Sequence, residues 1–253
     1  MTTSRPSRGF AYFLDIDGTL VEFASDPARI TLDAAVPRLL DTLAQSSGGA
    51  VALITGRTLA DVDRLFPGQR LAAAGLHGLE RRSADGRVDR HTAHPHALDG
   101  ARRKLAAVVH AHPRLLVEDK GISLALHYRR APLLGHYANR IMRELQRTLG
   151  DRYCLQKGKR VVELAPAGRD KGVAISAFMR EAPFHGRTPF FIGDDVTDEY
   201  GFAVVNRMGG WAVKVGRGFS AANWRFRDVR SVLAWLQHGT PLPVRSRTKR
   251  VWL

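Results

Sequence analysis

The chain has 253 residues, 44% of them hydrophobic and 25% charged, and its formal net charge at pH 7 is +15. This composition supplies a sizeable core for one large domain or two unequal ones, and it excludes an intrinsically disordered protein. The single cysteine, Cys154, rules out an internal disulfide, and no apolar run is long enough to span a membrane, so we expect a cytoplasmic protein without a membrane partner.

Strand and helix spacings alternate over the first third of the chain. Strands are expected at residues 12–14, 50–54 and 71–74, helices at 33–45 and 58–66, and a hairpin at 80–91. Such an alternation predicts βαβ units around a parallel sheet.

The middle of the chain has a different rhythm, in which a helix and two strands occur twice. The helices are expected at residues 97–110 and 133–149, and the strands at 115–117, 123–127, 152–155 and 160–164. The final third returns to the first pattern, with helices at 171–180, 198–205 and 228–237 and strands at 189–192 and 211–215. The predicted fold is therefore α/β: a Rossmann-like parallel-sheet core of residues 1–94 and 166–253, with an inserted α-β-β-α-β-β domain of residues 95–165.

Two carboxylates, Asp15 and Asp17, follow the first expected strand and precede a Gly-Thr turn. Like charges at a buried strand end are costly unless a cation or hydrogen bonds compensate them, and Mg²⁺ prefers such oxygen ligands. One carboxylate could then attack an electrophile while the other moves protons. The simpler alternative is a strand-to-turn junction in which Asp and Gly only close the turn.

Three further polar groups have the same kind of position, at the end of an expected core strand or the start of a helix. They are Thr55-Gly56-Arg57, Lys171, and the acidic segment of Asp194, Asp195 and Asp198. In parallel sheets ligands bind at this edge, and phosphoryl transfer needs hydroxyl and N–H donors, a cation and metal-binding carboxylates there. Taken singly, Thr55 could equally cap a helix and Lys171 could be a solvated lysine.

The four segments in this order resemble the motifs of the haloacid dehalogenase-like phosphatases. The resemblance implies that Asp15 is a nucleophile forming an aspartyl-phosphate, that Asp17 is the general acid and base, and that Thr55 and Lys171 hold the phosphoryl group. It also implies a Mg²⁺ site formed by Asp15, the backbone carbonyl of Asp17, and Asp194, with Asp195 and Asp198 in support. The inserted domain then resembles the cap of one branch of that superfamily.

Several segments between residues 13 and 236 further resemble the trehalose-6-phosphate phosphatases, among them Leu53-Ile54-Thr55-Gly56-Arg57, Gly75-Leu76-His77-Gly78, Val117-Glu118-Asp119-Lys120-Gly121 and Val162-Glu163-Leu164. This resemblance implies that Glu118, Lys120 and Glu163 bind sugar hydroxyls, which accords with the charge-assisted hydrogen bonds that such groups form. The alternative for these three residues is a salt-bridged surface. Arg57 is expected to contact the phosphate or the sugar, although an ion pair would explain it almost as well.

Two other interpretations remain open at this point. The same chemistry could act on another sugar phosphate, such as sucrose phosphate or mannosyl-phosphoglycerate. The high positive charge could instead serve nucleic-acid binding on an inactive scaffold, but the intact carboxylates and the lack of an arginine- and aromatic-rich recognition pattern disfavour it. The basic residues Arg245, Arg247, Lys249 and Arg250 predict a disordered end. The sequence gives no indication of oligomeric state.

Overall fold

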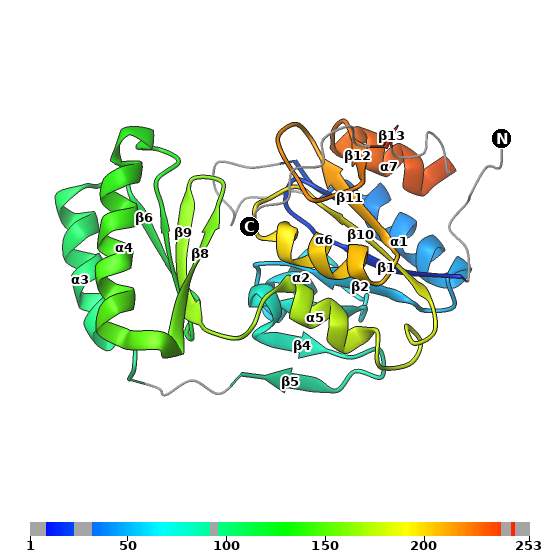
Figure 1. Ribbon diagram of the computed structural model, residues 1–253, viewed down its shortest axis with the longest axis horizontal. Coiled ribbons are helices and arrows are strands. Elements are labelled where there is room, and N and C mark those ends of the chain that lie inside the picture. The colour runs from blue at the N-terminus through cyan, green and yellow to red at the C-terminus, as the bar shows by residue number, and fades with distance from the viewer. Residues whose placement is uncertain (1–8, 23–31, 92–95, 239–243, 246–253) are drawn as a thin grey trace. The chain divides into compact units, whose positions relative to one another are not determined.

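The computed structural model describes residues 9–22, 32–91, 96–238 and 244–245. The chain divides into two compact units, each with its own sheet (Figure 1). The first unit comprises the chain up to Arg90 and from Asp170 onward, and the second runs from His91 to Arg169. The assignment of the first unit as the catalytic core and of the second as the cap stays a prediction. Among the described helices, none combines the length and the apolar character needed to cross a membrane.

The first unit contains a nine-stranded sheet that is parallel in its centre and antiparallel at both edges. Its strands are β1 (Phe10–Leu14), β2 (Val51–Ile54), β3 (Ala72–Gly75), β4 (Glu80–Arg82), β5 (Val88–Arg90), β10 (Thr188–Gly193), β11 (Trp211–Val215), β12 (Trp224–Phe226) and β13 (Val244–Arg245). The order is β13-β12-β11-β10-β1-β2-β3-β4-β5, and the strands from β12 to β3 are parallel. The predicted α/β fold with a parallel-sheet core is confirmed.

Helices cover both faces of this sheet (Figure 1). They are α1 (Ala35–Ser46), α2 (Leu59–Leu65), α5 (Lys171–Phe178), α6 (Asp198–Arg207) and α7 (Val229–His238). Side chains of α1, α2 and α7 share one buried cluster with one face of the strands, and those of α5 and α6 share a second cluster with the other face. Strand β1 is buried on both faces, which explains its continuous apolar sequence.

The register of the central strands brings their carboxyl ends to one edge. Leu14 of β1 lies beside Ile192 of β10 on one side and beside Leu53 of β2 on the other. The residues that follow these positions therefore emerge next to one another, although they are far apart in sequence. This edge is where ligands bind in open parallel sheets.

The second unit is an antiparallel sheet in the order β6-β7-β9-β8, covered on one face by two helices. Its strands are β6 (Leu116–Asp119), β7 (Leu124–His127), β8 (Tyr153–Gly158) and β9 (Val161–Pro166), and its helices are α3 (Asp99–Ala111) and α4 (Gly135–Leu149). Leu124, Leu126, Val162 and Leu164 pack against the helices. On the opposite face, Glu118, Ala125, Glu163 and Gln156 form a row across the four strands. The predicted order of elements in the insert is thus the observed one.

The end of the chain differs from expectation. Strands β12 and β13 were not predicted, because three and two residues are too few to show an alternating pattern. Arg245 lies in β13, where it pairs with Trp224, so the prediction of a disordered end is wrong for this residue. Arg247, Lys249 and Arg250 lie outside the described residues.

Candidate active site

Asp15 lies one residue past the end of β1 and is almost fully buried. Its backbone N–H donates to the carbonyl oxygen of Ile192, which continues the pairing with β10 beyond the last strand residue. Its carboxylate accepts a hydrogen bond from Lys171 Nζ at 2.8 Å and a longer one from the Thr19 hydroxyl at 3.4 Å. The predicted nucleophile is therefore held rigidly at the ligand-binding edge of the sheet.

Lys171 is the first residue of α5, a position where a positive charge opposes the helix dipole. The helix begins there because the Asp170 side chain caps it by accepting from the N–H of Val173 at 2.8 Å. The Lys171 ammonium group is buried and donates to Asp15 at 2.8 Å and to Asp198 at 2.7 Å. Burial alone would lower the pKa of Lys171, but the charges of these two carboxylates outweigh it and raise the pKa. The lysine therefore stays charged at this edge.

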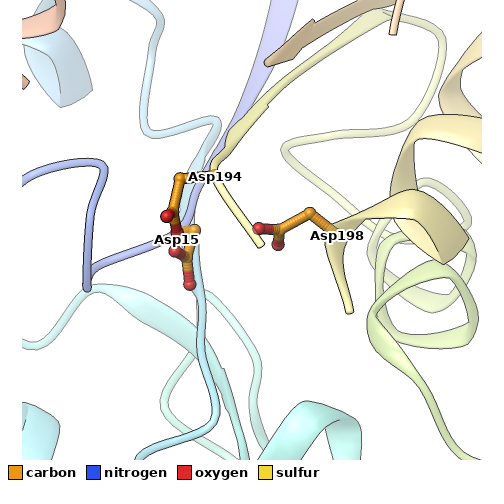
Figure 2. Close-up of side chains that lie close together, drawn as sticks. All are labelled: Asp15, Asp194 and Asp198. Carbon is orange, nitrogen blue, oxygen red and sulfur yellow. The ribbon is translucent and has the colours of Figure 1, made fainter. Parts of the chain in front are cut away.

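Asp194 and Asp198 join Asp15 in a cluster of three buried carboxylates (Figure 2). Each offers an oxygen, and the three atoms lie within 4.8 Å of one another. Asp198, the first residue of α6, also accepts from the backbone N–H of Asp195 at 2.8 Å, so both of its oxygens have partners in the protein. The carboxyl groups of Asp15 and Asp194 are adjacent in Figure 2, at the ends of neighbouring strands.

Gly193 makes room for this cluster at the end of β10. A Cβ atom at this position would lie 2.3 Å from Cγ of Asp198, a distance that real structures do not show. The Asp198 carboxylate thus occupies the space that any other residue at position 193 would fill. This close approach explains why a glycine precedes the acidic segment.

The electrostatics of the cluster fit a divalent cation. Burial raises the pKa of Asp15 well above its ordinary value; Lys171 lowers it, while the charges of Asp198 and Asp194 raise it further. Two buried ammonium groups lie at this edge, those of Lys171 and Lys214, and they do not balance three carboxylates, so an excess of negative charge remains. An all-oxygen donor set with excess negative charge is what Mg²⁺ prefers.

Asp17 points its carboxylate to Arg57 rather than to the acidic cluster. The guanidinium group donates from Nε at 2.8 Å and from a terminal nitrogen at 2.7 Å, one bond to each carboxylate oxygen. Such a two-point contact fixes the orientation of a carboxylate more strictly than a single bond. The ion pair that was the alternative for Arg57 is therefore present, and Arg57 orients the predicted general acid and base.

The loop after β2 places Thr55 fully buried at the same edge of the sheet. Thr55 does not cap α2: that role belongs to Thr58, which forms a capping box with Asp61. The Thr55 hydroxyl accepts from the backbone N–H of Arg57 at 3.2 Å. The helix-cap alternative for Thr55 is thus wrong, and its side chain belongs to the loop that carries Gly56 and Arg57.

His77 packs directly on this loop. A Cβ atom on Gly56 would lie 2.7 Å from the His77 ring, and the His77 N–H donates to the Thr55 carbonyl oxygen at 2.9 Å. Leu76 and His77 both have positive φ angles, 49° and 56°, in the left-handed region that residues other than glycine rarely adopt. Strained backbone of this sort gathers at functional sites.

The second unit holds its own polar cluster on the sheet face away from α3 and α4. Glu163 is buried and accepts from Lys120 Nζ at 2.9 Å and from the Ser123 hydroxyl at 2.6 Å. Glu118 lies 2.9 Å from Nε2 of His127. Burial by itself would raise the pKa of Glu118, but the hydrogen bond with His127 and the Lys120 charge outweigh it and lower the pKa. The three predicted sugar-binding residues thus lie in one ordered polar patch.

The structure brings most of the predicted residues of the core together. Asp15, Asp194, Asp198 and Lys171 form one connected group, and Thr55 directly follows the neighbouring strand β2. The side chain of Asp195 instead accepts from the N–H of Val196 at 2.8 Å. Sequence reasoning missed Lys214, Ser123 and His127 as members of these clusters. Lys214 could have been recognised as a charged residue inside the apolar strand Trp211–Val215.

Comparisons with solved structures show the fold class. The chain resembles the C-terminal domain of a trehalose-6-phosphate phosphatase from C. albicans, with a TM-score of 0.83 and 22% identity over 92% of this chain and 93% of that one. It also resembles a haloacid dehalogenase-like hydrolase from Bacteroides thetaiotaomicron, with a TM-score of 0.63 and 14% identity over 89% and 97% of the two chains. The fold is that of the haloacid dehalogenase-like hydrolases, as the resemblance of the motifs implied.

Sequence comparison narrows the class to a family. The sequence model of the trehalose-phosphatase family matches residues 13–227 of this chain. The chain is 43% identical to a trehalose-6-phosphate phosphatase of Escherichia coli (strain K12) over 241 residues, which are 93% of this chain and 88% of that protein. The chain belongs to the trehalose-phosphatase family.

Proposed function

We propose that this chain is a Mg²⁺-dependent phosphatase that hydrolyses trehalose 6-phosphate to trehalose and phosphate through an aspartyl-phosphate at Asp15. The family supports the substrate, and the geometry supports the mechanism. The observation that carries it is the buried Asp15 carboxylate, bonded to Lys171 and adjacent to Asp194. Because phosphoryl transfer depends on positioning and charge compensation, such a preformed arrangement suits it.

In the first half-reaction, an Asp15 carboxylate oxygen attacks the phosphorus atom as the bond from phosphorus to the sugar oxygen breaks. Asp17 gives its proton to that leaving oxygen, and trehalose is released. Lys171, and the Thr55 hydroxyl with the nearby Gly56 and Arg57, hold the oxygens of the phosphoryl group. The Lys171 charge also offsets the negative charge that approaches Asp15.

In the second half-reaction, Asp17 takes a proton from a water molecule whose oxygen attacks the phosphorus atom. The bond from phosphorus to Asp15 breaks, which releases phosphate and restores the Asp15 carboxylate. The same side chain thus serves as acid and then as base. The two hydrogen bonds from Arg57 support the role of base, because they hold the Asp17 carboxylate in one orientation with both of its oxygens as acceptors.

The proposed Mg²⁺ site consists of Asp15, the backbone carbonyl of Asp17, and Asp194. A bound Mg²⁺ would offset charge on the phosphoryl oxygens and orient the phosphate. Asp198 supports the site by holding Lys171 and the Asp195 N–H, and Asp195 supports it through the turn that it forms with Val196. We place the enzyme in the cytoplasm, where phosphorylated sugars are handled, with the sugar phosphate as its partner.

The direct test is phosphate release from the purified protein on a panel of trehalose 6-phosphate, sucrose phosphate, mannosyl-phosphoglycerate and an aryl phosphate. We expect trehalose 6-phosphate to give the highest kcat/KM. Chelation by EDTA should abolish release, and added Mg²⁺ should restore it. Preference for another sugar phosphate would contradict the substrate, and full activity in EDTA would contradict the metal.

Discrimination among sugars must come from residues other than those that hold the phosphate, and we propose Glu118, Lys120 and Glu163 for this role. Glu163→Gln keeps the shape of the side chain and removes its charge. We expect it to cost about 1–3 kcal/mol of transition-state stabilisation on trehalose 6-phosphate, the usual value of a hydrogen bond to a charged group. The measurement is kcat/KM on trehalose 6-phosphate and on an aryl phosphate, which offers no hydroxyls to bind.

The matched control is Glu144→Gln, which removes the charge of a half-exposed glutamate on α4 that pairs with Lys104. This control should leave both values of kcat/KM unchanged. Equal losses on both substrates in Glu163→Gln would mean that Glu163 supports the folding of its unit, where it pairs with the partly buried Lys120. Unchanged kcat/KM on both substrates would mean that Glu118, Lys120 and Glu163 form an ordinary salt-bridged surface and do not bind the sugar.

A further inference from the structure

A second buried lysine lies at the edge of the sheet that carries the acidic cluster. Lys214 belongs to β11 and is 6% exposed, although its neighbours in the strand are apolar. Burying an ammonium group is costly unless it finds partners that replace water. A lysine kept in such a place therefore needs a role that a packed apolar side chain could not fill.

The position of Lys214 in the sheet directs its side chain toward the acidic segment. Lys214 is in register with Gly193, the last residue of β10. Two residues earlier in β11, Ala212 faces the cluster packed by α5 and α6, and alternation along a strand places Lys214 on the same face. Asp15 follows Phe13 on that face in the same way. Lys214 thus lies on the side of the sheet from which Lys171 and Asp198 approach.

The Lys214 ammonium group donates a hydrogen bond to the backbone carbonyl oxygen of Asp194. An aspartate side chain has only two rotatable bonds, so the location of its carboxylate follows closely from the orientation of its backbone. A cation bonded to the carbonyl resists rotation of the peptide between Asp194 and Asp195. The opposite side of the same short segment is held by Asp198, which accepts from the Asp195 N–H.

We propose that Lys214 is a positioning residue for the metal site: it fixes the backbone of Asp194 and thereby presents the Asp194 carboxylate to the divalent cation. This inference rests on the proposed Mg²⁺ site and extends it to a residue that does not touch the ion. Mutation of a group that orients a metal ligand in this way typically weakens metal binding by about 10- to 100-fold.

The test replaces the ammonium group by an apolar group of similar length, Lys214→Met, and measures metal binding without substrate. Titration of the free protein with Mn²⁺, followed by electron paramagnetic resonance and competed with Mg²⁺, reports occupancy independently of turnover. We expect the dissociation constant to rise roughly 10-fold, within the usual range for a residue that orients a ligand. The Mg²⁺ concentration for half-maximal phosphate release should rise in parallel, while kcat at saturating Mg²⁺ stays within about threefold of wild type.

Two further variants make the outcome decisive. Lys104→Met makes the same change at a half-exposed lysine on α3 and should leave Mn²⁺ affinity unchanged. Lys214→Gln keeps a polar group at the buried position and should also weaken Mn²⁺ binding, and it decides the test if Lys214→Met does not fold. Mn²⁺ affinity within twofold of wild type in a folded Lys214 variant would overturn the proposal. A raised KM for an aryl phosphate with unchanged metal affinity would also overturn the proposal, because it would indicate that Lys214 contacts the phosphate.

Failure of this inference can be told apart from failure of the proposed metal site. Asp194→Asn should weaken Mn²⁺ binding if the site is correct. Weak binding in Asp194→Asn together with normal binding in Lys214→Met overturns the role of Lys214 alone. Normal binding in both overturns the metal site and the inference with it.

Discussion

Replacing Asp15 by asparagine should abolish turnover. Asparagine keeps the size of the side chain, but its amide cannot attack phosphorus in the manner of a carboxylate and is a poor ligand for Mg²⁺. Loss of a nucleophile typically lowers kcat by about 10⁴-fold or more. Phosphate release from trehalose 6-phosphate at saturating Mg²⁺ measures the effect, and circular dichroism checks that the variant is folded.

The control for this variant is Asp41→Asn, which makes the same change at an exposed position of α1. Its turnover should equal that of wild type. Turnover within tenfold of wild type in a folded Asp15→Asn variant would contradict the assignment of Asp15 as the nucleophile. Because the variant removes one of three like charges and one partner of Lys171, we expect only a small change in its melting temperature.

Replacing Lys171 by methionine should abolish activity and lower the free energy of unfolding. The variant leaves Asp15 and Asp198 buried without their shared cation, and removing one partner of a buried ion pair typically costs about 3–5 kcal/mol. Thermal unfolding at neutral pH measures the loss, and phosphate release measures the activity. Mg²⁺ should raise the melting temperature of the variant, because a cation bound only by the folded state stabilises it.

The stability of Lys171→Met should also depend on pH in a defined direction. The pKa of Asp15 is already raised by burial, and loss of Lys171 removes the charge that lowers it. A carboxyl group with a raised pKa in the folded state contributes most to the free energy of unfolding at low pH. This contribution is lost as the pH rises through that pKa. The difference in unfolding free energy between wild type and variant should therefore shrink as the pH falls below neutral. A difference that does not change with pH would contradict the burial of uncompensated carboxylates.

Local sequence patterns predicted the parts of the site that lie within one element. The apolar run of β1 placed Asp15 at a strand end, and the helical spacing after residue 170 placed Lys171 at a helix start. The strand before Asp194 was predicted in the same way. In each case the burial pattern is a property of a few consecutive residues, so the sequence shows it directly.

Contacts between distant residues could not be predicted from these patterns. Arg57 bonds to Asp17 across 40 positions, and Lys214 bonds to Asp194 across 20. Both depend on the order of strands in the sheet and on the register between them, which no local spacing encodes. The motif resemblance identified Arg57 as a member of the site but not its partner, and it did not include Lys214.

The close approach of Asp198 to Gly193 has a consequence for how this protein can vary. A larger residue at position 193 requires a shorter one at position 198, because both would occupy the same space. A shorter residue at 198 would leave Lys171 without one of its two carboxylate partners. No single exchange at either position is therefore neutral, and we expect natural or laboratory selection to keep the glycine and the aspartate as an inseparable pair.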